Sequence, residues 1–521
     1  IKTLNLDREQ KKTKKLKRPK PKKMKLLIYL LQYKCATQQC LIDIIGQGTK
    51  RSSSIFLSLL LTVVSALGTL SQVKGQQKIL TLDHVFDIVR KYHPVAKQAN
   101  LIVDSAVANR LAAKGAFDPS FYISNQQKTL DGKNYYFYTN PELKIPTWYG
   151  VDFKAGLEDN GGERLTVEAT RGRSSYVGVS LPLLKNLVTD RRRTTLEQAR
   201  IIVKQSEAAR RNELNNLLYD AATAYWNWVR EYQVYNVTTN VISVNEARFK
   251  LVRRSFFGGD RAAIDTVEAL TQLQNFQFLA SEAKYRWMAA GLELSNFLWL
   301  ENEQPFQLPA NIIPDTAWNN LNVNQYPVPS LEDALVTAKD NHPKIQTFDQ
   351  KLRVLEAERR LKFQSLLPSM NFNYNFLNKG YEPWKGVGKN VFENNYKYGI
   401  EFGLPLFLRQ GRGEYKGAKI KIQATDLQRD QASLEIENKV RDYFNQVVTL
   451  RQQVKLYEDA YENYVRLLRA EETKFSIGES SLFLLNSREN KVLEIRQKLL
   501  DLKTKFFKSL AALEWAAGNL K

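Results

Sequence analysis

The clearest hydrophobic pattern runs through residues 440–468 and leads into a turn at Gly478. Apolar and aromatic side chains recur in two rows at alternating spacings of three and four residues, which is typical of a heptad-patterned helix. One row holds Val440, Val447, Val454, Tyr461 and Leu468, and the other holds Tyr443, Leu450, Tyr457 and Tyr464. Glycine readily adopts the positive φ of a tight turn. The pattern therefore predicts a long helix that returns on itself as a hairpin.

The same pattern occurs in an earlier part of the chain. Its rows are Ala221, Trp228, Tyr235 and Ile242, and Leu218, Tyr225 and Tyr232. Val440 follows Ala221 by 219 positions, and Gly478 follows Gly259 by the same interval. Two other segments agree without a gap at a spacing of 249, with the pairs Leu82 and Leu331, His93 and His342, Pro94 and Pro343, Arg110 and Arg359, and Pro119 and Pro368. These agreements indicate an internal two-fold sequence repeat.

After Pro119 and after Pro368 the periodicity changes from about 3.6 to 2, which predicts β-strands. Apolar and polar residues alternate at 370–376 and 396–404, and the corresponding strands of the first half are expected at 120–126 and 176–181. One face of these strands is apolar and aromatic, and the other is polar. The apolar face would be the core of a soluble sandwich. In an exported chain with no second sheet, the wall of a lipid-facing barrel is favoured.

The insert at residues 127–173 has two interpretations. It alternates again at 149–157 and then reaches the turn at 159–162. It either adds strands to the barrel or forms an extracellular hairpin. The aromatic clusters at 135–138 and 148–149 are compatible with an interfacial girdle and with ordinary packing.

Two helical patterns, from about residue 190 to 256 and from about 411 to 475, contain no proline. At a rise of 1.5 Å per residue each helix would be roughly 100 Å long, which no compact globule needs. Each is expected to return through its glycine turn into a second helix, at about 262–300 and 480–518. The proline-rich residues 301–329 form the linker between a first structural repeat at 76–300 and a second at 330–521.

The N-terminal residues carry much of the positive charge. Residues 1–75 hold 16 Lys and Arg against 3 Asp and Glu, so +13 of the formal net charge of +23 lies there. Residues 1–50 are interpreted as a disordered basic extension or translated upstream sequence. No nucleic-acid partner is expected, because the basic run has no interleaved aromatic residues.

Residues 51–75 have the basic start, short apolar run and small-residue end of a secretory signal peptide. The mature chain would begin near Gln76. The two cysteines, Cys35 and Cys40, precede that point, so the exported chain would form no disulfide. No later stretch is apolar enough for a membrane helix, so a membrane crossing would have to use β-strands.

The order of these parts resembles the TolC-type outer-membrane efflux protein family over residues 80–520. The residues that carry the resemblance are Leu82 and Pro94 with Leu331 and Pro343, Leu181-Pro182-Leu183 with Leu404-Pro405-Leu406, and Phe256 and Gly259 with Phe475 and Gly478. The resemblance implies an α+β membrane protein. Long antiparallel helical hairpins would form a periplasmic tunnel, and each chain of a homotrimer would give four strands to a shared transmembrane β-barrel.

The same resemblance implies a function and partners. The chain would be the passive exit duct of a tripartite efflux pump or secretion system, in the lipid of the cell outer membrane. A periplasmic adaptor protein would join it to an inner-membrane transporter. The alternative is a structural coiled-coil protein of the envelope without a pore, which would not need two alternating, lipid-type strand hairpins.

In this family the helix tips bind the adaptor. The matching positions are Phe256, Phe257, Gly258, Gly259, Asp260 and Arg261 at the first tip, and Phe475, Ser476, Ile477, Gly478, Glu479 and Ser480 at the second. Exposed aromatic side chains at these tips would offer anchors to a partner. The alternative is that these residues only form the turns.

The resemblance also places a pore constriction at Asp265, Leu484 and Ser487. Asp265 matches an aspartate that ties neighbouring helices together in the best-known members. Its tyrosine and arginine partners are replaced here by Phe475 and Ser480, and inner acidic rings by Leu484 and Ser487. Without that hydroxyl and guanidinium the polar lock does not carry over. A narrowing made by Leu484 is the remaining hypothesis.

No enzyme is expected from the sequence. The three histidines, His84, His93 and His342, are too sparse for a local metal site and are expected to be structural, and no cofactor motif occurs in a supporting context. The many Glu and Arg residues of the long helices are interpreted as a solvated face with i,i+4 pairs.

Overall fold

The computed structural model describes residues 78–520, apart from residues 310, 321, 387–391 and 393. The expected basic extension at 1–50 and signal peptide at 51–75 lie outside these residues. The described helices are α3 (Leu82–Tyr92), α4 (Pro94–Lys114), α5 (Arg191–Phe257), α6 (Ala263–Ser295), α7 (Leu331–Asn341), α8 (Pro343–Phe363), α9 (Arg409–Ser476) and α10 (Leu482–Ala516). No described helix combines the length and the apolar character needed to cross a membrane.

The strands form two sheets. The small one pairs β1 (Lys78–Leu80) with β6 (Ile312–Pro314) in parallel. The large one has the order β2-β3-β4-β5-β7-β8 and is antiparallel throughout. Its strands are β2 (Ser120–Leu130), β3 (Lys133–Pro146), β4 (Asp152–Gly161), β5 (Gly172–Pro182), β7 (Ser369–Lys379) and β8 (Tyr396–Gly403).

The large sheet corrects the strand number implied by the family resemblance. It has six strands instead of four, because the insert at 127–173 supplies all of β3 and β4. These two strands pair with each other and with the flanking β2 and β5, so the insert is part of the sheet. The insert therefore adds two strands to this sheet.

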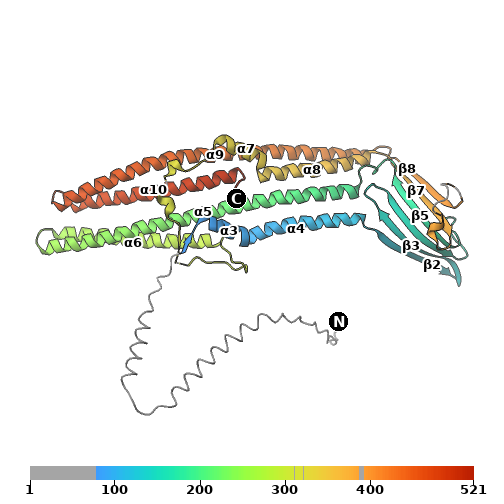
Figure 1. The fold of residues 1–521 in the computed structure, drawn as a ribbon, viewed down its shortest axis with the longest axis horizontal. Coiled ribbons are helices and arrows are strands. Elements are labelled where there is room, and N and C mark those ends of the chain that lie inside the picture. The colour runs from blue at the N-terminus through green and yellow to red at the C-terminus, as the bar shows by residue number, and fades with distance from the viewer. Residues whose placement is uncertain (1–77, 310, 321, 387–391, 393, 521) are drawn as a thin grey trace, which may run out of the picture. The chain divides into compact units, whose positions relative to one another are not determined.

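The long helices lie side by side (Figure 1). On the side of the large sheet the order is α9-α8-α5-α4, and toward the hairpin turns it is α9-α10-α5-α6. Helices α5 and α9, with 67 and 68 residues, belong to both of these four-helix sets and connect the sheet to the turns. The sheet therefore lies at one end of these helices and the two turns lie at the other.

The buried stripe of α9 follows the predicted heptads. Val440, Val447 and Val454 are each 0 % exposed. Val447 and Val454 pack in a core with α5 and α10, and Val440 packs in a core with α7 and α10. At mid-length the linker contributes Trp318, which meets the Trp226 ring edge-on at 5.7 Å between centroids. Trp226 also stacks on Phe507 of α10 at 4.6 Å. Residues 301–329 are thus anchored on the helices through aromatic contacts.

Candidate functional site

The turns that end α5 and α9 have the same backbone geometry. Gly259 and Gly478 adopt φ values of +83° and +82°. Asp260 donates its backbone N–H to the carbonyl of Ser255 at 2.9 Å, and Glu479 donates to Lys474 at 2.9 Å. This six-residue hydrogen bond around a left-handed glycine is the Schellman motif that closes helix C-termini. The glycines predicted for the two tips therefore form the turns.

Arg261 links the two tips to each other. Its guanidinium lies 4.1 Å from the centroid of the Phe475 ring, and its Nη2 donates to the Phe475 carbonyl at 3.3 Å. Its Nη1 lies 3.8 Å from Oδ2 of Asp265, one turn further along. A cation over an aromatic face is attracted by the ring quadrupole. A guanidinium is therefore present beside Asp265, although it comes from Arg261 and not from position 480.

The other tip residues differ in exposure. Phe257 is 74 % exposed, and Phe256 lies beside it with a ring-centroid distance of 5.6 Å. Gly258, Gly259, Asp260, Gly478 and Glu479 are also exposed. Phe475 is half-buried against a small core of Val252, Ala269, Leu482 and Leu485. The hydroxyl of half-buried Ser480 donates to the carboxylate of Glu471. The first tip thus presents more aromatic surface than the second.

The three constriction residues have different surroundings in the single chain. Asp265 pairs with Arg261. Ser487 lines a groove of about 610 Å³ between α6 and α10, together with Ile264, Val267, Thr271 and Phe483. Leu484 is exposed, and its backbone N–H is capped by the Ser481 hydroxyl at 3.3 Å. Polar contacts also cross this junction, because Asn486 donates to Glu268 at 3.2 Å.

A buried ion pair above the tips was not predicted. Arg248 of α5 contacts Glu489 of α10 through Nη1–Oε2 at 2.6 Å and Nη2–Oε1 at 3.3 Å, and Asn245 donates to the same carboxylate at 3.1 Å. The side chains of Arg248 and Glu489 are only 10 % and 8 % exposed. The expectation that the charged residues of the long helices face solvent is therefore wrong for Arg248 and Glu489. The available signal was that position 489 lies four residues after buried Leu485, on the same helix face.

The register of the large sheet separates its two faces. Phe121 pairs with Leu143, Phe153 with Val179, and Phe372 with Ile400. Since directly paired residues point to the same side, one face carries an apolar row across all six strands. The opposite face carries Lys154, Ser180, Asn373 and Glu401, among others. Phe121, Ile123, Phe153, Ile400 and Phe402 of the apolar face are exposed.

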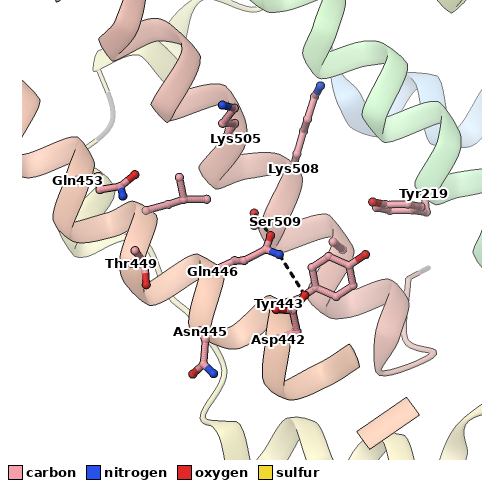
Figure 2. A pocket seen from close by; sticks show the side chains of 12 residues that line it. Tyr219, Asp442, Tyr443, Asn445, Gln446, Thr449, Gln453, Lys505, Lys508 and Ser509 are labelled. Carbon is pink, nitrogen blue, oxygen red and sulfur yellow. Dashed lines mark hydrogen bonds between the residues drawn. The ribbon is translucent and has the colours of Figure 1, made fainter. Parts of the chain in front are cut away.

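A second groove lies at mid-length between α9 and α10. Gln446 donates to Asp442 at 3.1 Å and accepts from the Ser509 hydroxyl at 3.4 Å. Figure 2 marks both hydrogen bonds with dashed lines. Tyr219 of α5 and Lys508 also line it. Burial lowers the pKa of Lys508, helped by the nearby charge of Arg230. The groove holds amides, hydroxyls and amines, and no cluster of three potential metal ligands occurs among the residues that the structure describes.

Two of the three histidines cap helices. Nδ1 of His93 accepts the backbone N–H of Val95 at 3.2 Å, and Nδ1 of His342 accepts that of Lys344 at 3.1 Å. In each case proline follows as the first residue of the helix, where its missing N–H costs nothing. Burial, with the charges of Lys344 and Lys439, lowers the pKa of His342 to about 4. The neutral ring is the form that accepts the capping hydrogen bond.

The chain was compared with protein-family models, curated proteins and solved structures. Residues 334–519 match the family model described as outer membrane efflux protein. No curated protein matches the chain in sequence. Among solved structures, the CmeC outer membrane channel of Campylobacter jejuni has a TM-score of 0.56 at 15 % identity, over 84 % of this chain and 86 % of that one.

Two further structures have the same fold. The open state of the MtrE outer membrane channel of Neisseria gonorrhoeae has a TM-score of 0.57 at 15 % identity, covering 84 % of this chain and 89 % of its own. A membrane protein from Pseudomonas aeruginosa reaches 0.60 at 14 % identity, over 85 % and 94 %. The resemblance predicted from the sequence is thereby confirmed: the second half of the chain matches the outer membrane efflux protein family, and the described chain has the fold of outer-membrane channels.

Proposed function

We propose that three copies of this chain form a passive exit duct in the outer membrane. The observation that carries the proposal is the two-faced sheet, whose apolar face includes the exposed Phe121, Phe153 and Ile400. Among the described residues no long helix packs on this face, since the helices meet the sheet at its strand ends (Figure 1). An alternation of apolar and polar faces without a covering layer is typical of a membrane barrel wall.

The edge helices support the assembly of several copies. On α9, the exposed Ile420, Leu427 and Leu434 recur every seven residues. On α6, the exposed Phe278, Tyr285 and Leu292 recur at the same spacing. Heptad rows of this kind pack against partner helices in coiled coils. In the trimer these rows contact the neighbouring copies, and the duplicated helices of the two halves form one tunnel through the periplasm.

The free tips are the surface for a periplasmic adaptor protein, which joins the duct to an inner-membrane transporter. The support is the exposed aromatic pair Phe256 and Phe257, beside the open turns at Gly259 and Gly478. Large aromatic side chains are common anchors of protein interfaces. The second tip contributes Glu479 and Ser480 to the same adaptor-binding surface. The substrates that enter the duct are determined by the transporter.

The narrowing of the pore at rest is made by the α6 and α10 ends, with Leu484 as the apolar element and Asp265 and Ser487 nearby. Leu484 is exposed in one chain and available to face its counterparts in the trimer. We expect Leu484→Ala to raise the resting leak current in planar bilayers. An unchanged leak, with the exposed Leu467→Ala on α9 as the matched control, would remove Leu484 from the constriction.

The proposed function is tested by conductance of the purified, detergent-extracted protein in planar lipid bilayers. Discrete channel openings are expected, together with recovery of the protein in the outer-membrane fraction of the cell. A protein that reaches the envelope and assembles, yet gives no conductance in any voltage range, would contradict the duct and favour the structural coiled-coil role.

A further inference from the structure

The two outer strands of the large sheet are each connected to an outer helix of the helical layer. Strand β2 is one outer strand, and it follows α4, the outer helix on its side. Strand β8 is the other outer strand, and it leads into α9, the outer helix on the opposite side. Figure 1 shows α4 and α9 at opposite margins of the helical layer. One side of the chain is therefore α4 with β2, and the other is β8 with α9.

These two sides match in strand direction. All five neighbouring pairs of the sheet are antiparallel, so the first and sixth strands, β2 and β8, run in opposite directions. When β8 of one copy lies beside β2 of the next, the new pair is antiparallel like the others. An open edge of unpaired N–H and C=O groups in lipid is highly unfavourable, and closure through a second copy removes both edges.

The two sides also match in side-chain chemistry. The apolar face includes Phe121 and Ile123 on β2, and it includes Ile400 and Phe402 on β8. All four side chains are exposed in the single chain. Placing β8 against β2 of the next copy continues the apolar row without interruption, and it keeps polar residues such as Glu401 on the opposite face.

The width of the sheet fits the width of the helical layer. Six strands at about 4.8 Å spacing and a tilt of about 40° span about 38 Å of a barrel wall. Four helices at about 9 to 10 Å spacing span about 36 to 40 Å. Four strands would span only about 25 Å, narrower than the four helices they continue. The insert strands β3 and β4 supply the difference.

We propose that this duct has an eighteen-stranded barrel, closed by β2–β8 pairing between copies and as wide as the helical tunnel below it. The inference rests on the proposed trimeric duct. Because barrel diameter grows roughly linearly with strand number, the barrel is about 1.5 times as wide as one built from twelve strands. Barrels of sixteen to eighteen strands leave an aqueous channel. The β3–β4 hairpin thus sets the width of the exit.

The direct test is electron cryo-microscopy of the purified trimer, in which eighteen strands are expected. In parallel, cysteines are paired across the proposed junction in a full-length Cys35→Ser, Cys40→Ser background. Phe121→Cys and Ile123→Cys are each combined with Ile400→Cys and Phe402→Cys. At least one combination is expected to give covalent dimers and trimers upon oxidation. The within-chain control is Ile145→Cys with Phe153→Cys, which are direct partners in the sheet.

The inference is overturned by a trimer whose barrel has twelve strands with β3 and β4 outside the wall. It is also overturned if the control pair oxidises while no β2–β8 combination links two copies. A protein that is not a trimer, or that does not conduct, instead contradicts the proposed function. The two failures are therefore distinguishable in the same preparations.

Discussion

Arg261 of the first tip covers Phe475 of the second, with 4.1 Å between the guanidinium carbon and the ring centroid. The same side chain reaches the Phe475 carbonyl and the Asp265 carboxylate. It therefore connects three groups from two hairpins at the end of the molecule opposite the sheet. Because Arg261 makes three contacts at once, the tip contact is expected to be sensitive to the loss of this side chain.

We predict that Arg261→Ala loosens the contact between the two hairpins and raises the resting leak current several-fold in planar bilayers. Arg261→Lys is expected to be intermediate, because an ammonium keeps the charge but cannot stack on the ring as a guanidinium does. Phe257→Ala is the control, since Phe257 is exposed and contacts Arg253 of its own helix. Equal leak in all three variants would exclude a holding role for Arg261.

Loss of the buried Arg248–Glu489 ion pair is expected to lower the stability of the fold strongly. Glu489→Gln removes the near counter-charge of the buried Arg248 guanidinium and leaves only Glu472, which is half-exposed and 3.9 Å away. We expect a loss of about 3 kcal/mol in the free energy of unfolding, at the lower end of the cost of breaking a buried ion pair. The double variant Arg248→Met, Glu489→Leu replaces the pair by apolar side chains and is expected to lose much less. Thermal unfolding of the trimer in detergent measures both.

The surface pair formed by Lys97 and Glu303 is the matched control for this comparison. It has a similar separation, 3.0 Å, but its side chains are 35 % and 71 % exposed. Glu303→Gln is expected to change stability by about 1 kcal/mol at most. If Glu489→Gln were equally mild, the Arg248 charge would have found other partners, and the account of a buried pair would not hold.

The lowered pKa of His342 leads us to expect that the folded chain becomes less stable in acid. Its pKa is about 4 in the folded chain against an ordinary value of 6.5, so between these pH values the unfolded chain binds a proton that the folded chain does not. Stability is therefore complete above about pH 6.5 and declines as the pH falls toward 4, by up to about 3 kcal/mol. Asparagine is a good N-cap that does not titrate. We expect His342→Asn to flatten the decline in melting temperature between pH 7 and pH 4.5, and an unchanged slope would contradict this assignment.

The helical part of the fold is largely predictable from the sequence. Helix α9 was expected from about 411 to 475 and runs from Arg409 to Ser476, because heptad spacing and a terminal glycine are local signals. Val440, Val447 and Val454 are buried as the heptad rows predict. Local periodicity shows which face of a helix is apolar, and in a molecule made of long helices that face becomes the core.

The sheet and the tips depend on contacts that periodicity does not contain. The alternation at 149–157 identifies a strand, but which neighbour Phe153 pairs with depends on register and on distant segments. In the same way, Arg248 and Glu489 are 241 positions apart, and nothing in either local sequence indicates that they meet. Arg261 was expected only as an adaptor-facing residue, because its contact with Phe475 joins separate hairpins.

The two faces of β5 provide a test of the membrane-facing wall with adjacent residues. Val179 pairs with Phe153 and Tyr374 on the apolar face, whereas Ser180 pairs with Asp152 and Asn373 on the polar face. A lysine that faces lipid costs about 2 to 4 kcal/mol at the bilayer midplane and less near the headgroups. Val179→Lys is therefore expected to reduce folding into lipid vesicles, as measured by urea titration of heat-resistant trimer, while Ser180→Lys stays close to the parent protein. If Ser180→Lys were the more damaging of the two, the polar face and not the apolar face would be the one in contact with lipid, and the orientation of the wall would have to be reversed.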